Sequence, residues 1–277
     1  MKAIHGVYNA NITRVCCDEK EGKSILYVGI SESDSFDIKF RNPPSAPISL
    51  SKQMTNDYHE FMDQVMEAVQ KNDAGEDRSN GHSLMNYAPA RVIQEKFITY
   101  ASTQLKLLEK VLKSSSNANE RAVAAFIIAY SANKKKITRD LLYAVEDADE
   151  EVRNNATRAI GIIAAYANKY PEKNIKIPAE PFIKMINSVI WTDRNKGIFV
   201  LLSLTEKRNR ELLKKIKLQA FNSLIEMAKW RNRSHAEMSF IILGRLADMK
   251  ENEIFEKWIT IHSSKQIDEL FMRKTSQ

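Results

Sequence analysis

The sequence has few of the residues that interrupt helices. It contains only 8 Gly and 7 Pro in 277 residues, less than average usage would give, and this scarcity favours helices over strands and turns. It has no run of about 18 apolar residues, so we expect no membrane insertion. No apolar stretch of signal-peptide type follows Met1, which predicts a cytoplasmic protein, or an exported one if a leader was trimmed before Met1.

Residues suited to disulfide, metal or nucleophilic chemistry are also scarce. The two cysteines, Cys16 and Cys17, are adjacent, and adjacent cysteines rarely bridge each other because the geometry is strained. The five histidines are scattered, with no pair at the spacing of a metal site, and the sequence has neither a P-loop nor a G-x-S-x-G motif. We therefore expect no catalytic residue, no metal and no cofactor, and so a protein that is not an enzyme.

What the sequence does contain is an ordinary globular composition with an uneven charge. Its 43% hydrophobic and 28% charged residues indicate a folded chain rather than a disordered one. The net charge is +7, yet residues 1–116 carry 14 Lys and Arg against 15 Asp and Glu. The basic excess lies in residues 117–277, where we expect an electrostatic partner to bind.

The first 50 residues have the pattern of strands. Residues 12–17 and 24–30 are apolar and β-branched, and a charged turn with Gly22 separates them. Residues 36–40 alternate strictly between apolar and polar types, and the prolines from Pro43 onward end the pattern. We predict a small three-stranded β-meander in residues 1–50, packed on the helices that follow because it is too small to be stable alone.

The spacing of apolar residues changes to that of helices from about Thr55. It predicts one amphipathic helix over residues 55–69 and a longer one over residues 89–112, and together these form a helical cap in residues 51–116. A polar segment, residues 73–83, joins them. It has three interpretations: a solvated connector, a loop that contacts a partner or substrate with His82 as proton carrier, or a divalent-metal loop.

A repeated helix begins in residues 147–156. An acidic turn leads into Val152-Arg153, Ala156 follows three residues later, and an apolar run covers residues 159–165. This segment resembles the second helix of a HEAT repeat. The same position recurs at Arg121, Arg194 and His235, at spacings of 32 or 41 residues, and an amphipathic helix precedes it over residues 138–145, 178–190 and 212–229.

The resemblance to the HEAT-repeat (armadillo-like) family implies a mainly α fold, a right-handed α-solenoid of HEAT type over residues 117–277. We expect Asp147 to cap the N-terminus of the following helix. We also expect a non-catalytic scaffold that mediates protein–protein interaction on the concave surface made by the second helices. The predicted partner-binding residues lie on these helices and on the polar segment: Asp73, Glu76, Asp77, Arg78, His82, Arg121, Arg153, Arg158, Arg194 and Lys196.

Basic residues near the last repeats suggest an alternative. Nine basic residues face three acidic ones between residues 205 and 235, around Trp230. Such a surface can hold phosphates while the indole stacks on a base, unless it is merely solvated and the indole is packed in the core. Trp191-Thr192-Asp193 resembles the aromatic and carboxylate pair of HEAT-like alkylpurine DNA glycosylases, which implies nucleic-acid binding or DNA repair. The candidate phosphate-binding residues are Lys207, Arg208, Arg210, Lys214, Lys215, Lys217, Arg231 and Arg233.

Overall fold

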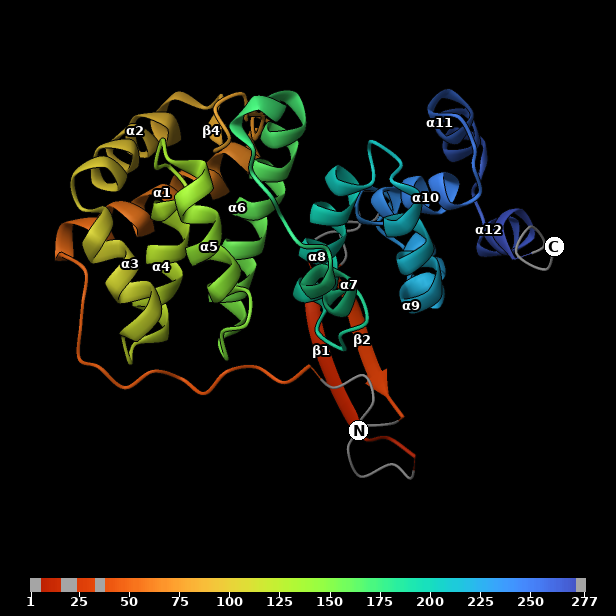
Figure 1. Ribbon diagram of the computed structural model, residues 1–277, viewed down its shortest axis with the longest axis horizontal. Helices are drawn as coiled ribbons and strands as arrows, with labels where there is room; N and C mark the ends of the chain where they lie inside the picture. The colour runs from red at the N-terminus through yellow and green to blue at the C-terminus, as the bar shows by residue number, and fades with distance from the viewer. Residues whose placement is uncertain (1–5, 16–23, 33–37, 273–277) are drawn as a thin grey trace. The chain divides into compact units, whose positions relative to one another are not determined.

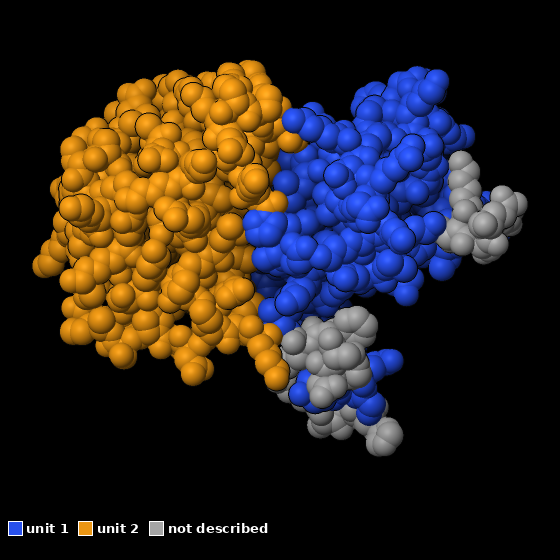
Figure 2. Space-filling model, in the orientation of Figure 1, with its two compact units in different colours: residues 1–38, 178–277 blue, residues 39–177 orange. Residues whose placement is uncertain are grey.

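The computed structural model describes residues 6–15, 24–32 and 38–272. Its described residues form twelve α-helices and two small antiparallel sheets (Figure 1), which confirms the mainly helical class. The chain divides into two compact units, shown in different colours in Figure 2. Unit 1 combines residues 1–38 with residues 178–277, and unit 2 is the continuous stretch of residues 39–177. Among the described helices, none has the length and hydropathy needed to cross a bilayer.

Unit 1 begins with a β-hairpin. Strands β1 (Asn9–Val15) and β2 (Ile25–Ser31) pair antiparallel, with Ile12 opposite Val28. Side chains alternate between the two faces of a strand, and on the inner face the Tyr27 ring stacks on Trp191, with centroids 5.3 Å apart. The hairpin therefore packs on helix α8, at whose first residue Trp191 stands.

The predicted third strand is wrong for the residues that the structure describes. Residues 38–40 belong to no strand, so the described part is a two-stranded hairpin and not a meander. The reason is a competing contact in unit 2: the Phe40 ring lies 3.8 Å from the Arg153 guanidinium, and Arg41 N–H donates to the Glu146 carbonyl at 2.9 Å. Residues 16–23, with both cysteines and the predicted turn, and residues 36–37 lie outside the described part.

Unit 2 is a group of packed helices. They are α1 (Lys52–Gln70), α2 (Ala88–Thr103), α3 (Leu105–Ser114), α4 (Ala118–Ile128), α5 (Lys134–Ala144) and α6 (Glu150–Lys169), followed by a 3-10 turn, η2 (Pro171–Lys173). Rings of Phe61, Phe97 and Phe126 meet edge to face or tilted in its core. The small residues Ala124 and Ala156 are fully buried where α4 packs on α6, so these helices approach closely.

The single helix predicted over residues 89–112 is divided into α2 and α3. Gln104 leaves the helical conformation, with φ −124° and ψ 24°, although its N–H still bonds to the Tyr100 carbonyl. The break has a packing reason, because it allows the apolar stripe of α3, Leu108 and Val111, to be buried against α4.

Unit 1 continues with the remaining helices: α7 (Glu180–Met185), α8 (Trp191–Leu204), α9 (Arg210–Ala228), α10 (Arg233–Leu246), α11 (Glu251–Thr260) and α12 (Ser264–Phe271). Gly197 lets α8 approach α7, since a Cβ there would lie 2.9 Å from the Met185 Cβ. Helix α7 ends earlier than the predicted residue 190, because Asn187 and Ser188 form tight turns and the Ser188 hydroxyl accepts from Ile190 N–H.

The position that recurs along the sequence does lie at the start of helices, but the prediction that Asp147 caps the following helix is wrong. Arg121, Arg153 and Arg194 lie in the first turns of α4, α6 and α8. Asp149 caps α6 by accepting from two backbone N–H groups, whereas the Asp147 carboxylate binds Arg121. Whether the helix pairs form one continuous solenoid stays a prediction.

Candidate functional site

Residues 76–85 form a small hairpin in unit 2 where the sequence predicted an open polar loop. Strand β3 (Glu76–Asp77) pairs antiparallel with β4 (Leu84–Met85). Gly81 has a positive φ of 70°, and a Cβ there would lie 2.9 Å from the Tyr166 ring and 3.0 Å from the Lys134 side chain. Glycine therefore permits this hairpin to pack against α5 and α6.

Glu76 fixes the hairpin through two arginines. Its carboxylate accepts from Arg158 of α6 and, at 2.7 Å, from Arg78. Burial raises the pKa of the Glu76 carboxyl, but the two guanidinium groups outweigh it and the net pKa is lowered. Two predicted partner-binding residues, Glu76 and Arg158, are thus brought together and bind each other.

The other acidic residues of the segment point outward. Asp73 is exposed just beyond α1. Asp77 is also exposed, and its carboxylate accepts from Ser79 N–H at 2.9 Å, a bond that lowers the pKa of Asp77 and shapes the turn. Arg78 lies half in solvent beside Glu76. These three side chains remain accessible, and their binding to a partner stays a prediction.

Buried Lys134 and half-buried His82 form a pair that the sequence did not predict. Lys134 is only 4% exposed, and its Nζ donates to the Ala129 carbonyl at 2.7 Å and lies 3.0 Å from His82 Nδ1. Burial lowers the pKa of Lys134 to about 7. Burial and then the Lys134 charge lower the pKa of His82 to about 4, although Asp77 opposes this shift.

An amine that loses its proton near neutral pH can act as a base or nucleophile, so the space beside this pair decides its role. The adjoining cavity measures about 20 Å³ and is lined in part by His82, Tyr130 and Arg158. That volume holds about one water molecule and no organic substrate. The geometry therefore assigns the pair to holding the hairpin on α5.

The Lys134 pair predicts a pH dependence of stability. Unfolding returns the pKa of Lys134 from about 7 to 10.5, so the unfolded chain binds more protons between these values and stability rises with pH there. We expect this group to add about 3 kcal/mol to the free energy of unfolding from pH 7 to pH 10, and Lys134→Met to remove that increment. Urea titrations at both pH values measure it.

Lys135→Met, at the exposed neighbouring position, is the matched control and should keep the wild-type pH dependence. A Lys134→Met variant with the same pH dependence as the wild type would contradict the assignment.

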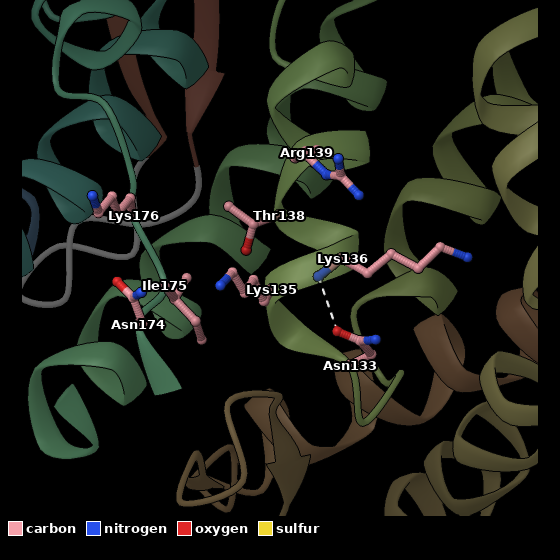
Figure 3. A pocket seen from close by; sticks show the side chains of 8 residues that line it. All are labelled: Asn133, Lys135, Lys136, Thr138, Arg139, Asn174, Ile175 and Lys176. Atoms are coloured by element: carbon pink, nitrogen blue, oxygen red, sulfur yellow. Dashed lines mark hydrogen bonds between the residues drawn. The ribbon is translucent and has the colours of Figure 1, made fainter. Parts of the chain in front are cut away.

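A second feature of unit 2 lies on the outer side of α5. A cleft of about 680 Å³ separates the first turns of this helix from residues 174–176 (Figure 3). This site was not singled out from the sequence, although Lys135 and Lys136 of one wall are adjacent in it. The other wall, with Lys176, comes from about 40 residues later, and no sequence pattern joined the two.

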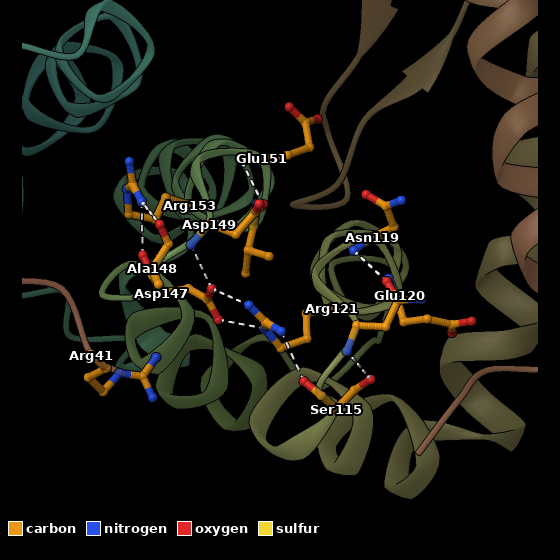
Figure 4. A network of polar contacts seen from close by, with 12 residues as sticks. Arg41, Ser115, Asn119, Glu120, Arg121, Asp147, Ala148, Asp149, Glu151 and Arg153 are labelled. Carbon is orange, nitrogen blue, oxygen red and sulfur yellow. Dashed lines mark hydrogen bonds and ion pairs between the residues drawn. The ribbon is translucent and has the colours of Figure 1, made fainter. Parts of the chain in front are cut away.

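Two of the predicted partner-binding arginines are internal (Figure 4). Arg121 and Arg153 are each 1% exposed. Arg121 donates to both Asp147 carboxylate oxygens, at 2.8 and 2.7 Å, and to the Ser115 carbonyl at 2.9 Å. Arg153 donates to the carbonyls of Asp147 and Ala148 at 2.9 and 3.0 Å. This corrects the expectation that they contact a partner, because their guanidinium groups tie α4 and α6 to neighbouring turns.

The predicted residues of α8 belong to unit 1. Arg194 is buried, pairs with Glu226 at 2.8 Å and lies 5.5 Å from the Trp230 ring, while Lys196 is half-buried. Asp193 is 1% exposed, and its carboxylate accepts from the Ser188 hydroxyl. Trp191 packs on Tyr27 and Trp230. Asp193 is thus buried in unit 1, and its resemblance to a glycosylase carboxylate stays a prediction.

The candidate phosphate-binding residues separate into two groups, both in unit 1. Several are engaged within the unit. Arg208 binds Glu251 and the Met249 carbonyl, and Lys215 binds Glu180. Arg233 donates to the Trp258 and Ile261 carbonyls, and exposed Arg231 also has a partner. The others are exposed and make no ion pair with a described residue: Lys207, Arg210, Lys214 and Lys217.

Known proteins do not assign a function to these features. No protein-family model matches the sequence, and a search of curated proteins finds no match. Among the residues that the structure describes, no three His, Cys, Asp or Glu side chains are grouped so that they could hold a metal ion.

Proposed function

We propose that the protein is a non-catalytic binding scaffold that holds a protein partner on the outer face of the β1–β2 hairpin of unit 1. The supporting observation is an apolar surface on that face. Ile12, Leu26, Val28 and Ile30 are 57%, 62%, 49% and 52% exposed. Contiguous exposed apolar side chains of this kind mark interaction sites, whereas single ones are common on any surface.

The backbone of the hairpin also favours a protein as the partner. Among the described residues, β1 and β2 pair only with each other, so each strand has an outer edge with N–H and C=O groups available for a further strand. A partner strand added there would gain main-chain hydrogen bonds and extend the sheet, while other apolar side chains of the same partner cover the outer face. The inner face, anchored through Tyr27 and Trp191, holds the hairpin in place for such pairing.

Photocrosslinking in cells that express the protein tests this proposal. A photoreactive amino acid at Leu26 should give one discrete protein adduct, and the double substitution Ile12→Thr with Val28→Thr should reduce its yield about tenfold, because two apolar contacts worth roughly 0.7 kcal/mol each are removed. The matched control, Ile98→Thr with Val92→Thr, changes the same residue types on the exposed side of α2 and should leave the yield unchanged.

Three outcomes would overturn it: no adduct at Leu26, an adduct whose yield the double substitution leaves unchanged, or equal loss in the control. Thermal unfolding of each variant, followed by circular dichroism, excludes a general loss of structure.

The α9 surface favours nucleic acid as the second candidate partner. Arg210, Lys214 and Lys217 are exposed at positions that share one face of α9, because residues three and four apart are neighbours on a helix. Contacts of such a row to phosphates weaken steeply as salt increases. A gel-shift assay with single- and double-stranded DNA and RNA at about 50 mM salt discriminates, since absence of binding there removes this candidate.

A further inference from the structure

The cleft of unit 2 is a strongly charged concave surface. Four of its eight lining residues are cationic, Lys135, Lys136, Arg139 and Lys176, and none carries a carboxylate. Lys135 extends toward the wall formed by residues 174–176 (Figure 3). Cations gathered in a concavity focus a positive potential that attracts anions.

Most of these charges are available to a ligand. Lys135, Arg139 and Lys176 are exposed and make no ion pair with any described residue, while Lys136 pairs with Glu109 of α3 at 2.6 Å. The positive end of the α5 helix dipole adds to the field, since α5 begins at Lys134, between the lining residues Asn133 and Lys135.

The neutral residues of the lining restrict the class of anion. Asn174 provides an amide from a left-handed backbone position with φ 48°, and Asn133 accepts Lys136 N–H at 3.0 Å as the cap of α5. Ile175 is the one aliphatic residue among the lining residues, which include no aromatic ring. Such a cleft has charge for a polyanion but no surface on which a nucleobase could stack.

We propose that this cleft binds a small ligand through an oligophosphate group. The cleft volume of about 680 Å³ lies in the range of small-molecule sites, roughly 300–1,000 Å³. Three unpaired cations match the several negative charges of linked phosphates better than the single charge of a carboxylate. The site lies in unit 2 and does not depend on the partner surface proposed for the hairpin of unit 1.

Isothermal titration calorimetry on the full chain tests the proposal with three probes: inorganic tripolyphosphate, ATP and citrate. We expect tripolyphosphate to bind with 1:1 stoichiometry and citrate to bind about tenfold more weakly. The double substitution Lys135→Gln with Lys176→Gln should weaken tripolyphosphate binding about tenfold or more. The matched control, Lys106→Gln with Lys110→Gln, removes two exposed charges from α3 and should change the affinity less than about twofold.

ATP identifies the source of the phosphates. If ATP binds with the same affinity as tripolyphosphate, the cleft recognises the phosphate chain alone. If ATP binds tenfold more tightly than tripolyphosphate, the cleft also contacts the nucleobase and the proposal is overturned. Absence of tripolyphosphate binding, or equal weakening in the control pair, would also overturn the proposal. Protection of Lys135 and Lys176 from acetylation by bound tripolyphosphate, read by mass spectrometry on the unsubstituted chain, locates the site even if the double variant folds poorly.

Discussion

Replacing Asp147 with alanine is expected to lower the free energy of unfolding by about 3–5 kcal/mol. The substitution removes both acceptors of the Arg121 guanidinium, at 2.8 and 2.7 Å, and leaves this buried cation without a counter-charge. The Arg121–Ser115 bond would remain, but one carbonyl cannot balance a buried cation. Urea unfolding followed by circular dichroism measures the loss.

Two variants distinguish the contribution of the Arg121–Asp147 ion pair to stability from that of the α6 N-cap. Asp149→Ala, two residues away, removes the N-cap of α6 and should cost only about 1 kcal/mol. Arg121→Met combined with Asp147→Leu should recover much of the stability, because a buried pair can be replaced by apolar side chains at little net cost. If Asp147→Ala were as mild as Asp149→Ala, the buried pair would not contribute as described.

The second large loss of stability is expected when Gly29 is replaced by alanine. A Cβ added there would overlap the Val189 carbonyl group, 2.7 Å from its carbon, and neither partner is the movable end of a side chain. Gly29→Ala should therefore displace β2 from the turn before α8 and cost about 3 kcal/mol, the upper end for overpacking. The fluorescence of Trp191 and Trp230, both in contact with Tyr27 of β2, should change with the displacement.

The neighbouring Val28 provides the control for this effect. Val28→Ala acts on the outer face, where the side chain is 49% exposed, and should change stability by less than about 0.5 kcal/mol with unaltered tryptophan fluorescence. A Gly29→Ala variant with wild-type fluorescence and melting temperature would show that the hairpin does not pack on α8 as described.

The helices were predictable from the sequence because their apolar residues follow the helical period over ten or more residues, as in α1 and α9. The hairpin of residues 76–85 was not, because each strand has only two residues, too few for any alternation to appear. Its position depends on Arg158, 82 residues after Glu76 in the chain. Local sequence contains no trace of that pairing.

The roles of charged residues were the hardest part of the candidate sites to predict. Asp147 and Asp149 both precede α6, and the sequence allows either to cap it. Because Asp147 pairs with Arg121, 26 residues earlier, Asp149 is the residue that caps α6. The cleft has the same origin, since Lys135 and Lys176 become neighbours only through tertiary packing. The charge counts predicted which part of the chain is basic. They did not predict which Lys and Arg side chains form internal ion pairs.

The construction of unit 1 from residues 1–38 and 178–277 has a consequence for biosynthesis. A ribosome that adds roughly 5–20 residues per second releases Gly29 on the order of ten seconds before Val189 emerges. During that interval unit 2, a continuous segment, can complete its fold, while the hairpin has no α8 on which to pack. The nascent chain thus carries an apolar strand pair that is unprotected on both faces, and the last third of the polypeptide determines when one of them is covered.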